Sequence, residues 1–251
     1  MLHRDGKRFR LLGWLFLAVW IVFTVQEAKA YYFSGGYPIL FAAGSVWILG
    51  AIQKKGLRWL KPVLTVGPLA PTVYLLPLAL PVLPVDATIA HIARVGIEPE
   101  PGERHEMGAL PQHFADMHGW QAMADTVASV CRKLTVDEQA RCYIFVRNYG
   151  EAGAIDYFGQ KLGLPNATCG HNNYWIWGPP DQPKDIGIIF GTEQNITESR
   201  ADLEQHFESV EYATTFQCRY CMPYENQRPI FICRGMRGYL GTIWETQKHY
   251  N

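Results

Sequence analysis

The sequence has no excess of either charge and no stripe of basic residues. Its 251 residues carry 23 Lys and Arg against 23 Asp and Glu, with a pI of about 7.1. Arg and Lys are scattered through the second half, so nothing indicates a nucleic-acid partner. No G-x-G-x-x-G dinucleotide signature is present, and the lone Cys218-x-x-Cys221 has no fourth ligand at the spacing of a zinc site.

Charge is also absent from three apolar runs, all of which lie before residue 86. They are Leu11–Val25, Tyr37–Ile52 and Pro62–Val85. A membrane-spanning helix needs roughly 20 mainly apolar residues, so we predict about three spans. The third run contains six prolines, which membrane helices tolerate where neighbouring groups satisfy the freed carbonyls.

Basic residues flank these runs in two places. Four lie within residues 1–10 and four in the loop Gln53–Lys61. The positive-inside rule places both in the cytoplasm and everything after Val85 outside. We therefore predict a membrane part (residues 1–85), a linker (86–110) and an extracytoplasmic domain (111–251). An alternative stays open, because Ala28-Lys29-Ala30 after an apolar run also resembles a signal-peptide cleavage site.

The polar second half alternates strand-like and helix-like segments. Strands are expected at Cys142–Arg147, Ile186–Phe190, Val210–Phe216 and Ile230–Cys233, and helices at Gln121–Leu134, Gly153–Leu162, Glu198–Glu208 and Tyr239–His249. This alternation predicts a small three-layer α/β domain with a partly parallel sheet.

The stretch Tyr143–Gly178 holds the candidate ligand-binding residues. A strand, a glycine-bracketed turn and a helix place Glu151 at the carboxyl end of a strand, where open α/β sheets bind ligands. About twenty residues later come His171, Asn172, Tyr174 and Trp175. Stacking faces combined with amide and imidazole groups suit a polar ring such as a sugar. Core packing is the competing interpretation of the aromatic residues.

Six cysteines are present, and three of them, Cys218, Cys221 and Cys233, lie near the C-terminus. An oxidising compartment favours a structural disulfide, here from Cys233 to Cys221 or Cys218, although the connectivity does not follow from sequence. A thioredoxin-type redox pair and a zinc site are weaker alternatives. The remaining Cys131, Cys142 and Cys169 are expected to be buried thiols.

Five segments carry a resemblance to a known family. Lys29-x-Tyr31-Tyr32 with Tyr37-Pro38 resembles an outer loop of bacterial family 39 glycosyltransferases, GT-C-type membrane enzymes that use polyprenyl-phosphate-sugar donors. Four segments of the polar domain are similar to the C-terminal domain of some of these proteins: Leu110–Trp120, Asn148–Asp156, Gly170–Gly178 and Cys218–Asn226.

The resemblance implies sugar transfer from the lipid-linked donor to an acceptor at the outer face of the bacterial inner (plasma) membrane, by a multi-pass protein in the lipid bilayer. It places Lys29 and Tyr32 near the donor phosphate, although an aromatic belt with a snorkelling lysine is the simpler explanation from chemistry. Glu151, His171, Asn172, Tyr174 and Trp175 become candidates for acceptor or sugar contact.

The catalytic loop of such enzymes precedes the segment matched here. Its acidic residue acts as a general base or supports a divalent metal in the complete enzyme. We therefore expect no catalytic residue and no cofactor in this chain, which resembles a C-terminal part from a truncated gene, a misplaced start or a split enzyme with a separate N-terminal half. The alternatives are a non-catalytic, membrane-tethered module that binds a glycan or a partner and, with less support, a tethered thiol oxidoreductase.

Overall fold

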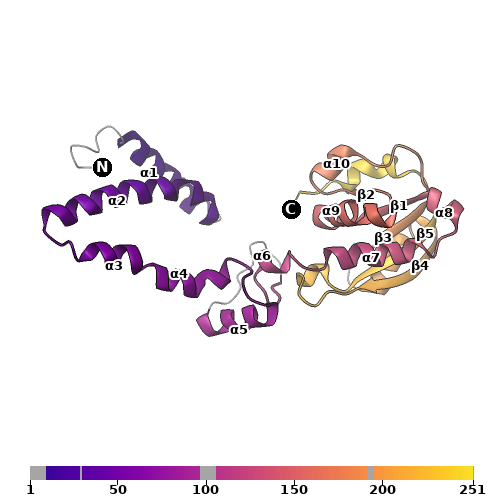
Figure 1. The fold of residues 1–251 in the computed structure, drawn as a ribbon. Coiled ribbons are helices and arrows are strands. Elements are labelled where there is room, and N and C mark those ends of the chain that lie inside the picture. The colour runs from indigo at the N-terminus through magenta and orange to yellow at the C-terminus, as the bar shows by residue number, and fades with distance from the viewer. Residues whose placement is uncertain (1–9, 29, 97–105, 192–194, 251) are drawn as a thin grey trace. The chain divides into compact units, whose positions relative to one another are not determined.

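A computed structural model describes residues 10–28, 30–96, 106–191 and 195–250. The chain divides into two compact units, Met1–Gly96 and Ile97–Asn251. Each unit has its own secondary structure, and Figure 1 shows helices in the first and a sheet with helices in the second. The two units are described separately.

The first unit consists of helices whose side chains are mostly exposed. Its helices are α1 (Arg10–Val25), η2 (Ala30–Gly36), α2 (Tyr37–Lys54), α3 (Leu60–Val66), α4 (Leu69–Leu75), η3 (Leu76–Leu78) and α5 (Val85–Val95), where η denotes a 3₁₀ helix. Large apolar residues such as Trp14, Phe41 and Trp47 are more than half exposed. An apolar surface of this kind suits contact with lipid.

The prediction of about three membrane spans is wrong. Among the described residues one helix, Tyr31–Lys54, is long and apolar enough to cross a membrane, with 24 residues and a mean hydropathy of 1.5. The first run forms α1, which has only 16 residues. The third is broken into α3 and α4 of seven residues each and the short η3. Proline explains the breaks, because it lacks an N–H and disfavours helical geometry in the residue before it.

The second unit is built on one mixed sheet of five strands. They are β1 (Cys142–Val146), β2 (Ala167–Cys169), β3 (Ile186–Phe190), β4 (Phe207–Phe216) and β5 (Arg228–Met236), in the order β2-β1-β3-β5-β4. Strands β1, β2 and β3 are parallel, whereas β5 is antiparallel to both β3 and β4. All five residues of β3 are buried, as expected for a strand covered on both faces.

Helices cover both faces of the sheet (Figure 1). On one face, α7 (Trp120–Cys131) and α9 (Tyr149–Phe158) pack against β1 and β3 through residues such as Val127, Ile155 and Ile188. On the other, α11 (Ile196–Leu203) and η6 (Leu240–Gln247) contribute Leu203, Leu240 and Trp244 to a second cluster. The short α10 (Asn173–Trp177) supplies Tyr174 to the first cluster and Trp175 to the second. This α/β arrangement agrees with the three layers expected from sequence.

Several short helices lie outside the predicted elements. They are α6 (Gln112–Ala115), α8 (Val136–Ala140), α10 (Asn173–Trp177) and η5 (Pro223–Glu225), whereas η4 (Gly159–Leu162) forms the end of the predicted helix Gly153–Leu162. Thr135 and Glu138 form a capping box at the start of α8, which is a local sequence signal for this helix. The segment predicted as a linker begins with α5, whose Val85–Val95 ends at Gly96 in the left-handed conformation.

Candidate functional site

The parallel strands β1, β2 and β3 have their carboxyl ends on the same side of the sheet, which we call this edge. The direction in which the chain moves across the sheet reverses there. The chain passes from β1 outward to β2 and then returns to β3 on the other side of β1. Open α/β sheets bind ligands at such a switch point. Strand β5 starts at this edge, since the Gly191 N–H donates to the Pro229 carbonyl oxygen at 2.8 Å.

Segments far apart in sequence contact one another in this unit. A Cβ atom added to Gly119 would lie 2.8 Å from Cys218 Sγ, and one added to Gly150 would lie 3.1 Å from the Trp120 indole. The Tyr174 hydroxyl donates to Asp156 Oδ2 at 2.7 Å. These contacts join the segments 110–120, 148–156, 170–178 and 218–226.

Glu151 is fully buried in the first turn of α9, a few residues after the end of β1. Asn148 caps α9, because its Oδ1 accepts from the Glu151 backbone N–H at 2.9 Å. In return, Glu151 Oε2 accepts from the Arg147 backbone N–H at 2.7 Å. Its Oε1 atom is buried without a hydrogen-bond partner among the described residues. One carboxyl oxygen therefore fixes the start of α9, and the hydrogen-bonding capacity of the other is unused by the described residues.

Glu225 is a second buried carboxyl group near Glu151. It is 4% exposed, and its Oε2 is also buried without a hydrogen-bond partner in the described part of the chain. Burial, together with the charges of Glu151 and Asp116, raises the pKa of Glu225 to about 8, while Arg228 opposes this rise. We call Asp116, Arg147, Glu151, Glu225 and Arg228 the carboxyl-end cluster.

Burial also raises the pKa of Glu151, against the backbone N–H of Arg147 and the charge of Arg228. A carboxyl group with a pKa near 8, as at Glu225, holds a proton near neutral pH. A protonated carboxyl donates a hydrogen bond, an ionised one accepts, and the guanidinium of Arg228 donates only. The cluster can therefore bind a ligand rich in hydroxyl groups or exchange a proton with it.

His171 follows β2 and is packed among aromatic rings. Its ring lies 4.7 Å from that of His249 in a stacked arrangement and 4.8 Å from that of Tyr149. The Gly170 carbonyl accepts from the His249 N–H at 3.1 Å, and His249 Nε2 lies 3.0 Å from the Arg147 carbonyl oxygen. The C-terminal segment is thus anchored beside the ends of β1 and β2.

The other predicted sugar contacts lie on or next to α10 and have mainly structural partners. Asn172 adopts a positive φ of 52°, and its N–H donates to the His249 carbonyl at 3.2 Å. Tyr174 donates to Asp156, and Trp175 is packed in the second core cluster. Trp177, by contrast, is 69% exposed, with its ring 4.7 Å from that of Tyr174. Trp177 is therefore the indole of this segment that is open to a sugar ring.

The chain matches nothing in three comparisons. No protein-family model, no curated protein and no solved structure is similar to it. Function must therefore be argued from the site and from the sequence resemblance. Among the described residues, no three His, Cys, Asp or Glu side chains gather in a way that would hold a metal ion. The carboxyl-end cluster consequently does not fit the divalent metal of the resembled enzymes.

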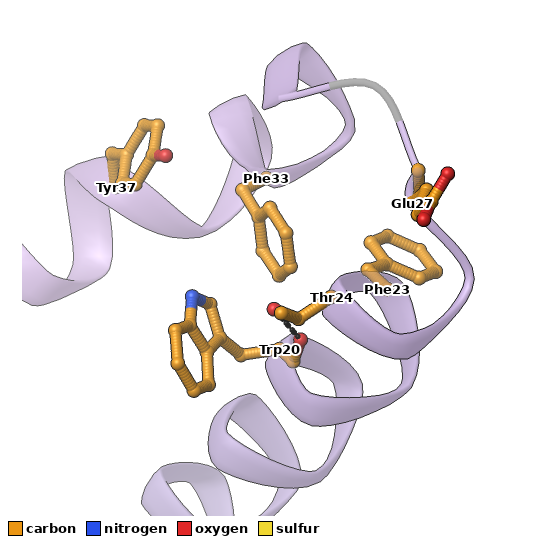
Figure 2. Close-up of a pocket in the computed structure, with 7 residues that line it drawn as sticks. Trp20, Phe23, Thr24, Glu27, Phe33 and Tyr37 are labelled. Atoms are coloured by element: carbon orange, nitrogen blue, oxygen red, sulfur yellow. Dashed lines mark hydrogen bonds between the residues drawn. The ribbon is translucent and has the colours of Figure 1, made fainter.

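A hollow lies in the first unit, between α1 and the start of the α2 segment. This open pocket of about 400 Å³ is lined by Trp20, Phe23, Thr24, Glu27, Ala28, Phe33 and Tyr37. Figure 2 shows the Phe33 ring pointing toward α1, and its centroid lies 5.0 Å from that of Phe23. Tyr32 packs edge-on against Phe23 at 5.9 Å and is 55% exposed. Lys29, the other predicted phosphate contact, lies outside the described residues.

The predicted disulfide from Cys233 is not present, since all six cysteines are free thiols. Cys233 lies in β5 and belongs to the cluster of Tyr143 and Trp244, whereas Cys218 packs against the cluster on the opposite face. The sheet therefore separates the two sulfur atoms, and a disulfide needs Cα atoms within about 7 Å. Cys131, Cys142 and Cys169 are buried thiols, as predicted.

Four residues of this edge were not predicted from sequence: Asp116, Arg147, Glu225 and Arg228. Glu225 follows Cys218 and Cys221 in the same loop, and its burial depends on the long-range packing of that loop. A Pro-Tyr-Glu-Asn run directly before an apolar strand was the available signal, because it places a carboxyl group at a strand end.

Proposed function

We propose that this chain is the C-terminal part of a membrane glycosyltransferase that transfers a sugar from a polyprenyl-phosphate-sugar donor to an acceptor at the outer membrane face. One observation carries the proposal: three of the four segments that resemble these enzymes contribute a residue to the carboxyl-end cluster, namely Asp116, Glu151 and Glu225. Under this proposal the cluster binds the acceptor, and the catalytic base belongs to the loop that precedes the matched segment in the resembled enzymes.

The chemistry of the cluster supports an acceptor rich in hydroxyl groups. Glu151 and Glu225 each have a buried oxygen atom without a hydrogen-bond partner among the described residues, and Arg228 contributes positive charge beside them. Hydrogen bonds to charged groups contribute about 1.5–3 kcal/mol each, so a few of them fix the orientation of a sugar. An acceptor hydroxyl held at this edge would attack the anomeric carbon as the bond to phosphate breaks.

The first unit supports the donor side of the proposal. Its exposed apolar helices and the aromatic pocket of Figure 2 suit a hydrocarbon chain. Tyr31–Lys54 is the segment that we propose as the membrane anchor.

The exposed Trp177 favours a second candidate, a non-catalytic glycan-binding module. An indole of this exposure offers a stacking face to a sugar ring. Such a module would bind a glycan through Trp177, and removal of the module would leave sugar transfer unchanged.

Transfer of a radiolabelled sugar tests the proposal. Membranes from cells that make the full chain, cells that lack it and cells with Glu225→Gln are given the polyprenyl-phosphate-linked sugar. We expect removal to abolish transfer and Glu225→Gln to lower turnover by up to about tenfold, the loss expected for one hydrogen bond of a protonated carboxyl group. The exposed Glu208→Gln is the matched control. Unchanged transfer without the chain would overturn the proposal, and glycan binding lost with Trp177→Ala would then favour the module.

A further inference from the structure

Cys218 and Cys221 face each other across a tight bend that follows β4. The Cys221 backbone N–H donates to Cys218 Sγ at 3.2 Å, and the Cys221 thiol donates to the Cys218 carbonyl oxygen at 3.4 Å. Residues three apart in such a bend have Cα atoms within about 7 Å, which is the range that a disulfide requires.

We propose that Cys218 and Cys221 are a thiol–disulfide exchange site, and that they form a reversible disulfide with each other when a disulfide-bearing oxidant is present. The proposal is independent of sugar transfer. It replaces the predicted bond to Cys233 with a bond inside one loop.

Exposure selects Cys218, and contact with Cys218 then selects Cys221, which is buried and whose pKa is raised first by that burial. Cys218 is half-buried, whereas the other five are buried. Burial raises the pKa of Cys142 to about 12, of Cys169 to about 11 and of Cys233 to about 12. Because the thiolate is the attacking species, these buried thiols react slowly. Cys218 is therefore the nucleophile, and the adjacent Cys221 resolves the intermediate.

The reaction proceeds by two exchanges. The Cys218 thiolate attacks one sulfur of the oxidant, which forms a mixed disulfide and releases the oxidant's other sulfur as a thiolate. The Cys221 thiolate then attacks Cys218 Sγ, which forms the Cys218–Cys221 bond and releases the second sulfur. The pair loses two electrons and two protons, and the oxidant becomes two thiols.

The position of the bend connects this site to the carboxyl-end cluster. The Cys218 N–H donates to Asn226 Oδ1 at 2.9 Å, so the bend and the residue after Glu225 are tied together. The charge of Glu225 also acts on the Cys221 thiol. A disulfide between Cys218 and Cys221 would rigidify the loop that contains Glu225.

Redox titration of the full chain in detergent tests the proposal. The reduced protein is equilibrated with oxidised and reduced glutathione, its free thiols are alkylated, and it is digested with trypsin. Cleavage after Arg219 separates the two cysteines, so a Cys218–Cys221 bond holds two peptides together until reductant is added. We expect this linked pair, with the other four cysteines alkylated after denaturation.

Two variants sharpen the result. Cys221→Ser should trap Cys218 as a mixed disulfide with glutathione, because the resolving thiol is missing. Cys233→Ser should leave the linked pair unchanged. Full alkylation of Cys218 and Cys221 in oxidised glutathione would overturn the proposal, as would a bond from either of them to Cys233.

Discussion

Trp175 and Trp244 exchange hydrogen bonds across the second core cluster. The Trp175 indole N–H donates to the Trp244 carbonyl oxygen at 3.1 Å, and the Trp244 indole N–H donates to the Trp175 carbonyl oxygen at 2.9 Å. Lys248 Nζ lies 3.9 Å from the Trp175 ring centroid and covers that face. Trp175 therefore holds η6 against α10.

The first prediction follows from this exchange. Trp175→Phe removes one indole donor and should lower the free energy of unfolding by about 1 kcal/mol, the usual contribution of a hydrogen bond. Trp177→Ala is the control, since this exposed residue should change stability by no more than about 0.5 kcal/mol. Urea denaturation of the full chain, followed by circular dichroism, measures both. A larger loss of unfolding free energy for Trp177→Ala than for Trp175→Phe would contradict the assignment of Trp175 as the structural indole.

The sequence was sufficient to predict most of the sheet. Ile186–Phe190 has the predicted bounds, and β1, β4 and β5 contain or overlap the predicted strands, because β-branched and aromatic runs mark buried strands locally. The three-residue β2 was missed, since so short a strand has no detectable period. The membrane spans failed for another reason: length and hydropathy alone did not account for six prolines in one run.

The candidate site was predictable only in part. Glu151 at the end of β1 follows from the strand–turn–helix pattern. Glu225 joins it through loop packing across more than seventy residues of sequence, and no local pattern encodes such a contact. Which of Trp175 and Trp177 is packed and which is exposed likewise depends on which indole hydrogen-bonds to Trp244, and tertiary structure decides this.

The second prediction concerns the pH dependence of stability at Glu225. Its pKa rises from an ordinary value of 4.5 to about 8 in the folded chain. Between these values the folded state retains a proton that the unfolded state has lost, so this group makes stability fall as pH rises from 4.5 to 8. The slope reaches at most about 1.4 kcal/mol per pH unit.

Glu225→Gln should flatten this part of the profile, because a glutamine does not titrate. Urea midpoints of both proteins at pH 5, 6, 7 and 8 measure the difference, and the variant should gain on the wild type as pH rises. Parallel profiles would mean that Glu225 ionises normally in the folded chain. Glu208→Gln, at an exposed position, serves again as the control.

A third prediction has the opposite sign and concerns Glu138. Arg234 Nε donates to Glu138 Oε1 at 2.7 Å, and this bond, with the Thr135 backbone N–H, lowers the pKa of Glu138 from 4.5 to about 2. A depressed pKa stabilises the folded state above pH 4.5, and the stabilisation is lost as pH falls through about 2. Glu138→Gln should therefore be less stable than the wild type at pH 7, and the difference in stability between the two proteins should shrink in acid. Melting temperatures at pH 7 and pH 3 measure it, and a constant gap would argue against the ion pair.

The fourth prediction separates the two oxygens of Glu151. Glu151→Ala removes the acceptor of the Arg147 N–H and should destabilise the chain by about 1–3 kcal/mol, the cost of a buried donor left unpaired. Glu151→Gln keeps that acceptor and should fold, yet it should bind the acceptor sugar more weakly. Isothermal titration of the full-length variant with the acceptor, next to its urea midpoint, distinguishes the two effects. Equal destabilisation by both substitutions would mean that the carboxyl group is only structural.

The last prediction tests the proposal that Tyr31–Lys54 anchors the chain in a membrane. An arginine near the centre of a membrane helix costs about 2.5–3.5 kcal/mol on insertion, which is roughly a hundredfold in equilibrium. Ala43 lies near the middle of Tyr31–Lys54 and is exposed. Ala43→Arg should therefore move the full chain from the carbonate-resistant membrane fraction to the soluble fraction, whereas Ala43→Leu should leave it in the membrane. If Ala43→Arg stays in the membrane, another segment anchors the chain, and α1, with 16 apolar-rich residues, would be the next helix to substitute.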